Sequence, residues 1–122
     1  MENWKSWLED WYKEQVEVRH MLHRNPELPY EERETTRFLK QQLTAWGIRV
    51  EELPGLETGV SAVIEGAHPG PMLVLREDID ALPILENTGL GFASQKPGVC
   101  HACGHDVPPG RCSSCGKSST AV

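Results

Sequence analysis

The 122-residue sequence has no apolar run that approaches the ~18 residues needed to span a bilayer as a helix. It also has no excess of positive charge, because 12 Lys and Arg stand against 18 Asp and Glu, for a formal net charge of −6. An acidic surface disfavours nucleic acid and anionic membranes as partners. The N-terminus is acidic and amphipathic, unlike a secretory signal peptide. We therefore expect a cytoplasmic protein with neither nucleic-acid nor membrane partners.

Cysteines are few, and in a cytoplasmic protein the four that are present are more often metal ligands or reactive groups than disulfide partners. Two of them lie in one short segment, Cys100-His101-Ala102-Cys103-Gly104-His105-Asp106. Thiolate sulfur and imidazole nitrogen are ligands that zinc prefers. Gly104 lets the backbone bend so that Cys103 and His105 can converge on one ion. The segment therefore predicts a divalent-metal site.

Apolar residues at helical spacing predict two helices in the first half of the chain. The first covers residues 3–24 and stops at Asn25-Pro26, because proline disfavours helical geometry in the residue before it. The second runs from about Pro29 to Trp46, with proline in its first turn and acidic residues near its positive end. His20 and His23 have no third candidate ligand nearby, so we expect a solvated helix edge and a turn residue, respectively.

The periodicity changes after Gly47, which is placed to cap the second helix. Ile48–Glu51 alternates between apolar and polar residues, as does Gly59–Glu65, and both patterns predict strands. Met72–Leu75 is continuously apolar, which is typical of an inner strand covered on both faces. Two helices followed by these strands predict an α/β fold, with the helices packed on a mixed sheet.

Carboxylates follow the predicted inner strand, at the end where open α/β sheets carry their ligand sites. Asp78 and Asp80 lie two residues apart and point the same way in an extended chain. Two like charges side by side need a compensating cation, which a metal or its ligand network would supply. The alternative is a solvated acidic loop.

Taken in order, these stretches resemble the M20 family of metallopeptidases and amidohydrolases. The closer resemblance is to its branch of N-acyl amino acid amidohydrolases, which also contains auxin-conjugate and hippurate hydrolases. The resemblance runs from about residue 14 to 106, and Glu77 stands where the family usually has a small residue. The matching residues are Leu22-His23-Arg24-Asn25-Pro26-Glu27-Leu28, Glu31, Thr35-Thr36, Gly59-Val60, Asp78-Ile79-Asp80-Ala81-Leu82-Pro83-Ile84, Gly91-Phe92-Ala93-Ser94 and His101-Ala102-Cys103-Gly104-His105-Asp106.

The resemblance implies a hydrolase that depends on zinc or manganese and cleaves the amide bond of N-acyl amino acids or peptides. It implies that Cys103 and His105 bind the metal and that Asp80 is the catalytic carboxylate that orients the site. Asp78 and Asp106 are expected near the metal shell. A metal of this kind polarises the scissile carbonyl and lowers the pKa of bound water, and a carboxylate then takes the proton.

The family's general base, further histidine ligands and inserted domain come after the Cys/His segment and have no counterpart in this sequence. We therefore expect residues 1–106 to be a truncated, N-terminal portion of a zinc-peptidase-like catalytic domain. This portion should be inactive alone and prone to self-association through an unpaired sheet edge. Residues 107–122 have no apolar period and contain several turn residues, so we expect an unrelated, disordered tail. Codon arithmetic over Arg111–Cys115 allows this tail to be the family's next helix read out of frame.

An alternative interpretation is a small structural zinc module without catalysis. Four thiolates in two CxxC pairs commonly form a closed zinc site. Here the pairs would be Cys100 with Cys103 and Cys112 with Cys115, eight residues apart. That linker is shorter than the usual ~15–20 residues. Such a module would need all four thiols and no aspartate.

Overall fold

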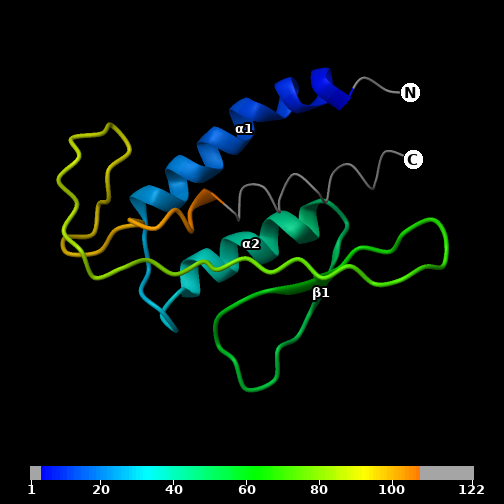
Figure 1. Cartoon of the computed structure of the whole chain (residues 1–122). Helices are drawn as coiled ribbons and strands as arrows, with labels where there is room; N and C mark the ends of the chain where they lie inside the picture. The colour runs from blue at the N-terminus through cyan, green and yellow to red at the C-terminus, as the bar shows by residue number, and fades with distance from the viewer. Residues whose placement is uncertain (1–3, 108–122) are drawn as a thin grey trace.

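A computed structural model describes residues 4–107 as two helices, a small sheet and a long run of loops (Figure 1). Helix α1 covers Trp4–Arg24 and α2 covers Arg33–Ala45. Strands β1, Arg49–Glu51, and β2, Ser61–Val63, pair antiparallel with Val50 opposite Ala62. The sequence-based expectations for the tail beyond residue 107, including Cys112 and Cys115, lie outside the described residues.

Helix α1 ends where the sequence predicts, and local hydrogen bonds explain why. The amide of Asn25 donates to the carbonyl of Leu22, and its side-chain amide donates to the carbonyl of Met21. The carbonyls of the last turn, which have no partner within the helix, are thereby satisfied. Pro26 follows as a fully buried residue and turns the chain away from the helix axis.

Helix α2 begins at Arg33, four residues after the predicted start at Pro29, so that boundary was wrong. Tyr30 has φ +65°, a left-handed conformation that a right-handed helix cannot accommodate. The amide of Glu31 bonds to the carbonyl of Leu28 and closes a separate turn before the helix. The positive φ of Tyr30 thus delays the start of α2.

The far end of α2 confirms the predicted glycine cap. Gly47 has φ +73°, and the amide of Ile48 donates to the carbonyl of Leu43. This long return bond is typical of a helix that ends in a left-handed glycine. It buries Ile48 and leads directly into β1, which packs against α2.

The inner strand predicted over Met72–Leu75 is not formed within residues 4–107. All four of its apolar side chains are exposed, from 61% to 83%. Between the described residues, no backbone hydrogen bond involves this segment. A strand that is apolar on both faces needs neighbours on both edges, and the two short antiparallel strands do not provide them. The described sheet is therefore antiparallel rather than mixed.

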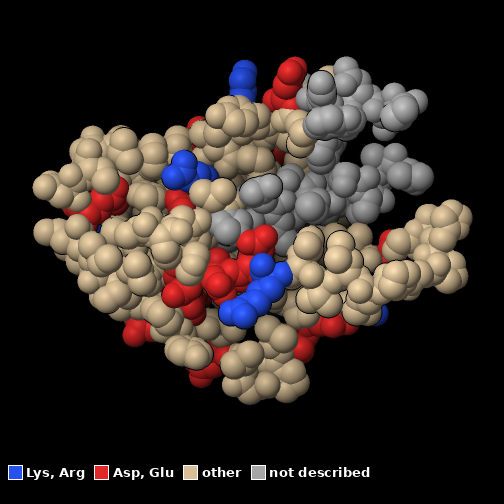
Figure 2. Space-filling model, in the orientation of Figure 1, with Lys and Arg blue, Asp and Glu red and all other residues tan. Residues whose placement is uncertain are grey.

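Within residues 4–107 the apolar core is small, and its buried apolar residues are Leu22, Ile48, Ala81 and Cys100. Buried polar side chains lie beside it, among them His23, Glu27 and Asp106. On the face seen in Figure 2, acidic side chains gather near the centre with a few basic ones beside them, and wide areas carry no charge. No helix among the described residues is long and apolar enough to cross a membrane.

Candidate functional site

Backbone hydrogen bonds bring the Asp80 segment and the Cys/His segment together. The amide of Ala81 donates to the carbonyl of Glu27, in the turn between the two helices. Leu82 and Cys100 then exchange two backbone bonds, of 2.9 and 3.0 Å, in an isolated antiparallel bridge. In Figure 1 the orange segment that follows this bridge meets the C-terminal end of α1. These bonds place the residues around Asp80 next to the loop that carries Cys103 and His105.

Asp80 and His105 form the central contact of the predicted site. The Nδ1 atom of His105 lies 2.9 Å from Oδ1 of Asp80 and 3.1 Å from its carbonyl oxygen. Both oxygens accept, so Nδ1 carries the proton, and in the neutral ring the lone pair lies on Nε2. Metal-binding histidines are commonly oriented by a carboxylate in this way. The side chains are 29% and 27% exposed, so solvent reaches the pair.

The two predicted thiols have different surroundings. Cys103 is exposed and reduced, and it is separated from His105 only by Gly104, whose φ of +85° favours glycine. Cys100 is buried, and burial raises the pKa of its thiol, which disfavours the thiolate that a metal requires. The four-thiolate module is therefore not favoured. Among the described residues, no three His, Cys, Asp or Glu side chains are arranged to hold a metal.

Asp78 forms an ion pair with a neighbouring arginine. Its carboxylate accepts a 3.0 Å bond from the guanidinium of Arg76, and its side chain is about half exposed. The guanidinium of Arg76 thus supplies a positive charge that compensates the carboxylate of Asp78. Its expected place near the metal shell stays a prediction.

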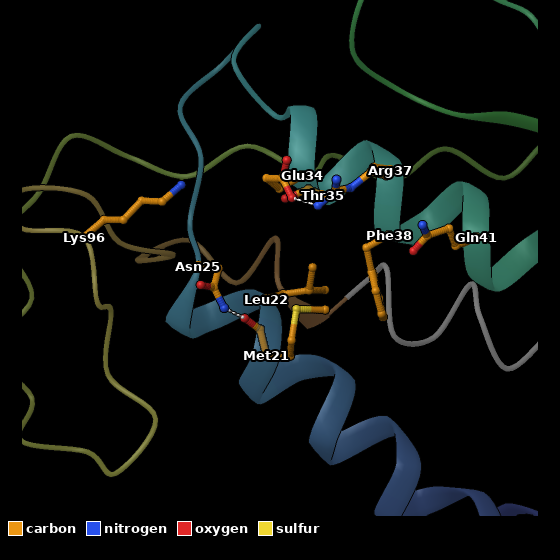
Figure 3. A pocket seen from close by; sticks show the side chains of 9 residues that line it. All are labelled: Met21, Leu22, Asn25, Glu34, Thr35, Arg37, Phe38, Gln41 and Lys96. Carbon is orange, nitrogen blue, oxygen red and sulfur yellow. Dashed lines mark hydrogen bonds and ion pairs between the residues drawn. The ribbon is translucent and has the colours of Figure 1, made fainter.

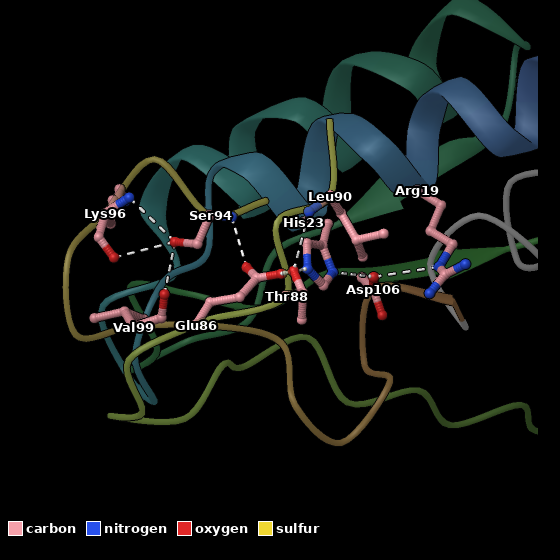
Figure 4. A network of polar contacts seen from close by, with 9 residues as sticks. All are labelled: Arg19, His23, Glu86, Thr88, Leu90, Ser94, Lys96, Val99 and Asp106. Carbon is pink, nitrogen blue, oxygen red and sulfur yellow. Dashed lines mark hydrogen bonds and ion pairs between the residues drawn. The ribbon is translucent and has the colours of Figure 1, made fainter. Parts of the chain in front are cut away.

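Asp106 is tied into a polar network rather than exposed (Figure 4). Its carboxylate is almost fully buried, at 1% exposure. Oδ2 lies 2.8 Å from Nδ1 of His23 and accepts a 3.3 Å bond from Nε of Arg19, both on α1. The other nitrogen of His23 lies 3.1 Å from Oε1 of Glu86. The expectation that His23 is a turn residue is wrong, because it belongs to the last turn of α1 and its ring is buried between two carboxylates.

Glu86 is the second carboxylate of the network and is strongly held as an anion. Its pKa is lowered to about 2, first by the hydroxyl of Thr88, then by the backbone amide of Ser94 and by His23. The corresponding distances are 2.6 Å for the hydroxyl and 2.6 Å for the amide. Ser94 in turn donates its hydroxyl to the carbonyl of Val99 at 2.6 Å, next to the Cys/His segment.

His101 lies beside this network with its ring buried. Its ring centroid is 6.4 Å from that of His23. Burial lowers its pKa, so the neutral ring is favoured. Neither ring nitrogen has a hydrogen-bond partner among the described residues.

A shallow groove of about 300 Å³ lies elsewhere, between the C-terminal part of α1 and α2 (Figure 3). Met21, Leu22 and Phe38 give it an apolar floor, and Arg37 and Lys96 line its sides. None of the predicted metal ligands or aspartates lines it. The groove is therefore separate from the candidate site.

Comparisons with known proteins are consistent across sequence and structure, although no family model matches the chain. The chain is 46% identical over 100 residues to thermostable carboxypeptidase 1 of Saccharolobus solfataricus, which covers 82% of this chain and 25% of that protein. It is 51% identical over 94 residues to the N-acetyl-L-cysteine deacetylase of Bacillus subtilis, and the match covers 77% of this chain and 22% of the deacetylase.

The crystal structure of the Bacillus subtilis YXEP protein, described as a dinuclear metal-binding peptidase of the M20 family, is similar with a TM-score of 0.84. The two are 37% identical, over 91% of this chain and 32% of that one. Over these residues the chain is similar to M20 peptidases. It spans about a quarter of the length of the curated relatives that it matches.

Two residues that matter for the site were missed by reasoning from local patterns. His23 and Glu86 meet across 63 positions, and His23 meets Asp106 across 83. No periodicity links positions so far apart. The available signal was the family resemblance, because His23, Ser94 and Asp106 all belong to its matching stretches.

Proposed function

We propose that this chain supplies the N-terminal part of the active site of a metal-dependent hydrolase, which cleaves the amide bond of N-acyl amino acids or related peptides. The observation that carries the proposal is the hydrogen bond from Nδ1 of His105 to Asp80. It leaves the Nε2 atom of His105 available two residues from the exposed thiol of Cys103. A borderline metal prefers this pair of donors.

The donor set fits a zinc or manganese ion, with Cys103 and His105 as two of its ligands. When bound, the metal polarises the scissile carbonyl and activates water. Asp80 contributes by holding the proton on Nδ1 of His105, which fixes both the tautomer and the orientation of the ring. Because catalytic zinc sites usually take three protein ligands, the remaining ligands and the general base are expected from residues beyond those described.

The substrate class rests on the relatives. One similar protein is named as a deacetylase of N-acetyl-L-cysteine and another as a carboxypeptidase, and both names denote cleavage of an amide bond. We propose N-acyl amino acids as the substrates, as in the branch with the auxin-conjugate and hippurate hydrolases. The cytoplasmic location expected from the use of cysteine belongs to the same proposal.

A chimera tests this function directly. The 94 residues of the Bacillus subtilis deacetylase that match this chain would be replaced by the matching residues of this chain. We expect the chimera to hydrolyse N-acetyl-L-cysteine and related N-acyl amino acids only when zinc or manganese is supplied. Cys103→Ala and His105→Ala should abolish turnover.

The matched control for the chimera is His68→Gln, which changes an exposed histidine that makes no contact with the site. We expect this variant to retain the activity of the chimera. A folded chimera that binds metal as tightly after Cys103→Ala as before it would contradict the proposal.

A further inference from the structure

His23 closes a buried contact that involves three separate parts of the chain (Figure 4). It stands in the last turn of α1, and its ring is buried. Nδ1 lies 2.8 Å from a carboxylate oxygen of Asp106, and Nε2 lies 3.1 Å from one of Glu86. The two nitrogens of one buried ring thus face carboxylates from two different loops.

Both carboxylates that face His23 have further partners. The pKa of Glu86 is lowered to about 2, so it is an anion, and Asp106 also pairs with Arg19. The side chains of Glu86 and Asp106 are 6% and 1% exposed, so loss of the His23 ring would remove a buried partner from each of them. Removing one partner of a buried charged group is strongly destabilising.

Phe92 adds an apolar contact to the same three-way junction. Its ring stacks on that of His20 at 3.9 Å between centroids and meets the edge of His23 at 5.3 Å. The guanidinium of Arg19 lies 5.9 Å from the same ring centroid. The loop that carries Glu86 and Phe92 thus contacts α1 twice, through the carboxylate of Glu86 at His23 and through the ring of Phe92 at His20 and His23.

We propose that His23 is a positioning residue that fixes the metal-binding loop to α1 through its paired hydrogen bonds with Asp106 and Glu86. Asp106 directly follows His105 in the sequence, so restraining its carboxylate restrains the backbone of the predicted ligands. Among the described residues, the hydrogen bonds and ring contacts of His23 go to other partners than Cys103 and His105, which distinguishes it from a ligand or a catalytic residue. The inference rests on the proposed function for the identity of the metal site.

The first test measures how firmly His23 holds the two loops in the full chain without metal. Amide hydrogen exchange around Glu86 and around Asp106 should be faster in His23→Gln than in the wild type. His68→Gln, at an exposed histidine, provides the comparison. Unchanged exchange at both loops in His23→Gln would overturn the proposal.

The second test measures the positioning effect with cobalt(II) as the probe. We expect His23→Gln to weaken cobalt binding about 10- to 100-fold, as is usual when support for a metal ligand is lost, and His68→Gln to leave it unchanged. Glu86→Gln should also weaken cobalt binding, because it replaces one of the two carboxylates that hold the ring of His23. Equal affinities for His23→Gln and His68→Gln would overturn the positioning role.

The two tests also separate this inference from the proposed function. If the wild-type chain binds cobalt without involving Cys103, the proposed metal site fails, and the positioning role fails with it. Faster exchange in both loops of His23→Gln would then support only a structural bridge between α1 and the two loops. If the site binds cobalt through Cys103 and His23→Gln has no effect, the proposed function stands and this inference alone is refuted.

Discussion

Glu27 offers a sharp test of how the turn between the helices supports the site. Its buried carboxylate accepts the amides of Glu34 at 3.1 Å and Thr35 at 2.8 Å. These are the second and third residues of α2, where an N-cap side chain normally bonds. Glu32, at the N-cap position itself, makes no side-chain cap. Glu27 therefore caps α2 from a distance, while its carbonyl holds Ala81 beside Asp80.

The expected loss of stability follows from these two hydrogen bonds and from the negative charge of the Glu27 carboxylate. Loss of an N-cap side chain costs ~1 kcal/mol, with a range of about 0.5–2. Loss of a negative charge at a helix N-terminus adds about 0.3–1 kcal/mol. We expect Glu27→Gln, which keeps one acceptor oxygen, to lower the free energy of unfolding by ~1 kcal/mol. Glu27→Ala should lower it by about 2–3 kcal/mol, because both bonds and the side-chain packing are lost.

Urea unfolding, monitored by circular dichroism, measures the decrease in the free energy of unfolding. Glu31→Gln is the matched control. Glu31 is an exposed acidic residue in the same turn, and no hydrogen bond of its side chain is seen. At a slope of about 1–2 kcal/mol per molar urea, Glu27→Ala should lower the midpoint by about 1 M or more. Faster hydrogen exchange at the amides of Glu34 and Thr35 should accompany it. Equal destabilisation by Glu27→Gln and Glu31→Gln would refute the capping role.

Three further predictions concern acid, self-association and metal. Because the pKa of Glu86 falls from 4.5 to about 2 on folding, its stabilising contribution is complete above about pH 4.5 and is lost as the pH falls towards 2. The midpoint of urea unfolding should therefore fall less steeply with decreasing pH in Glu86→Gln than in the wild type. Leu73→Lys, at a side chain 83% exposed, should reduce self-association in sedimentation velocity, whereas Tyr12→Lys on α1 should not. Asp80→Asn should weaken zinc affinity about 10- to 100-fold in calorimetric titration, and an unchanged affinity would show that Asp80 does not orient His105.

Features with a local cause could be predicted from the sequence. The end of α1 at Asn25-Pro26 and the cap at Gly47 follow from the conformational preferences of proline, asparagine and glycine. The start of α2 could not, because nothing local indicates the left-handed conformation of Tyr30. The backbone of Tyr30 is fixed by the turn that the following residues close.

Features that depend on distant partners were predicted poorly from periodicity. The segment Met72–Leu75 has the composition of an inner strand, but a strand forms only where neighbours pair with it. His23 was expected in a turn, yet it is helical and its ring is buried against carboxylates far along the chain. The ordered family motifs carried that long-range information, since they contain His23, Glu27, Asp80 and Asp106.

The most direct measurement of the central claim is the absorption spectrum of the full chain loaded with cobalt(II). A thiolate ligand gives a sulfur-to-cobalt charge-transfer band in the near ultraviolet, and only a thiol that binds the metal contributes to it. We predict that the band is present in the wild type, is lost in Cys103→Ala and His105→Ala, and persists in Cys100→Ala, because Cys100 is buried and its thiol pKa is raised. A band that survives Cys103→Ala, or that requires Cys100, would contradict the assignment of Cys103 and His105 as the metal ligands.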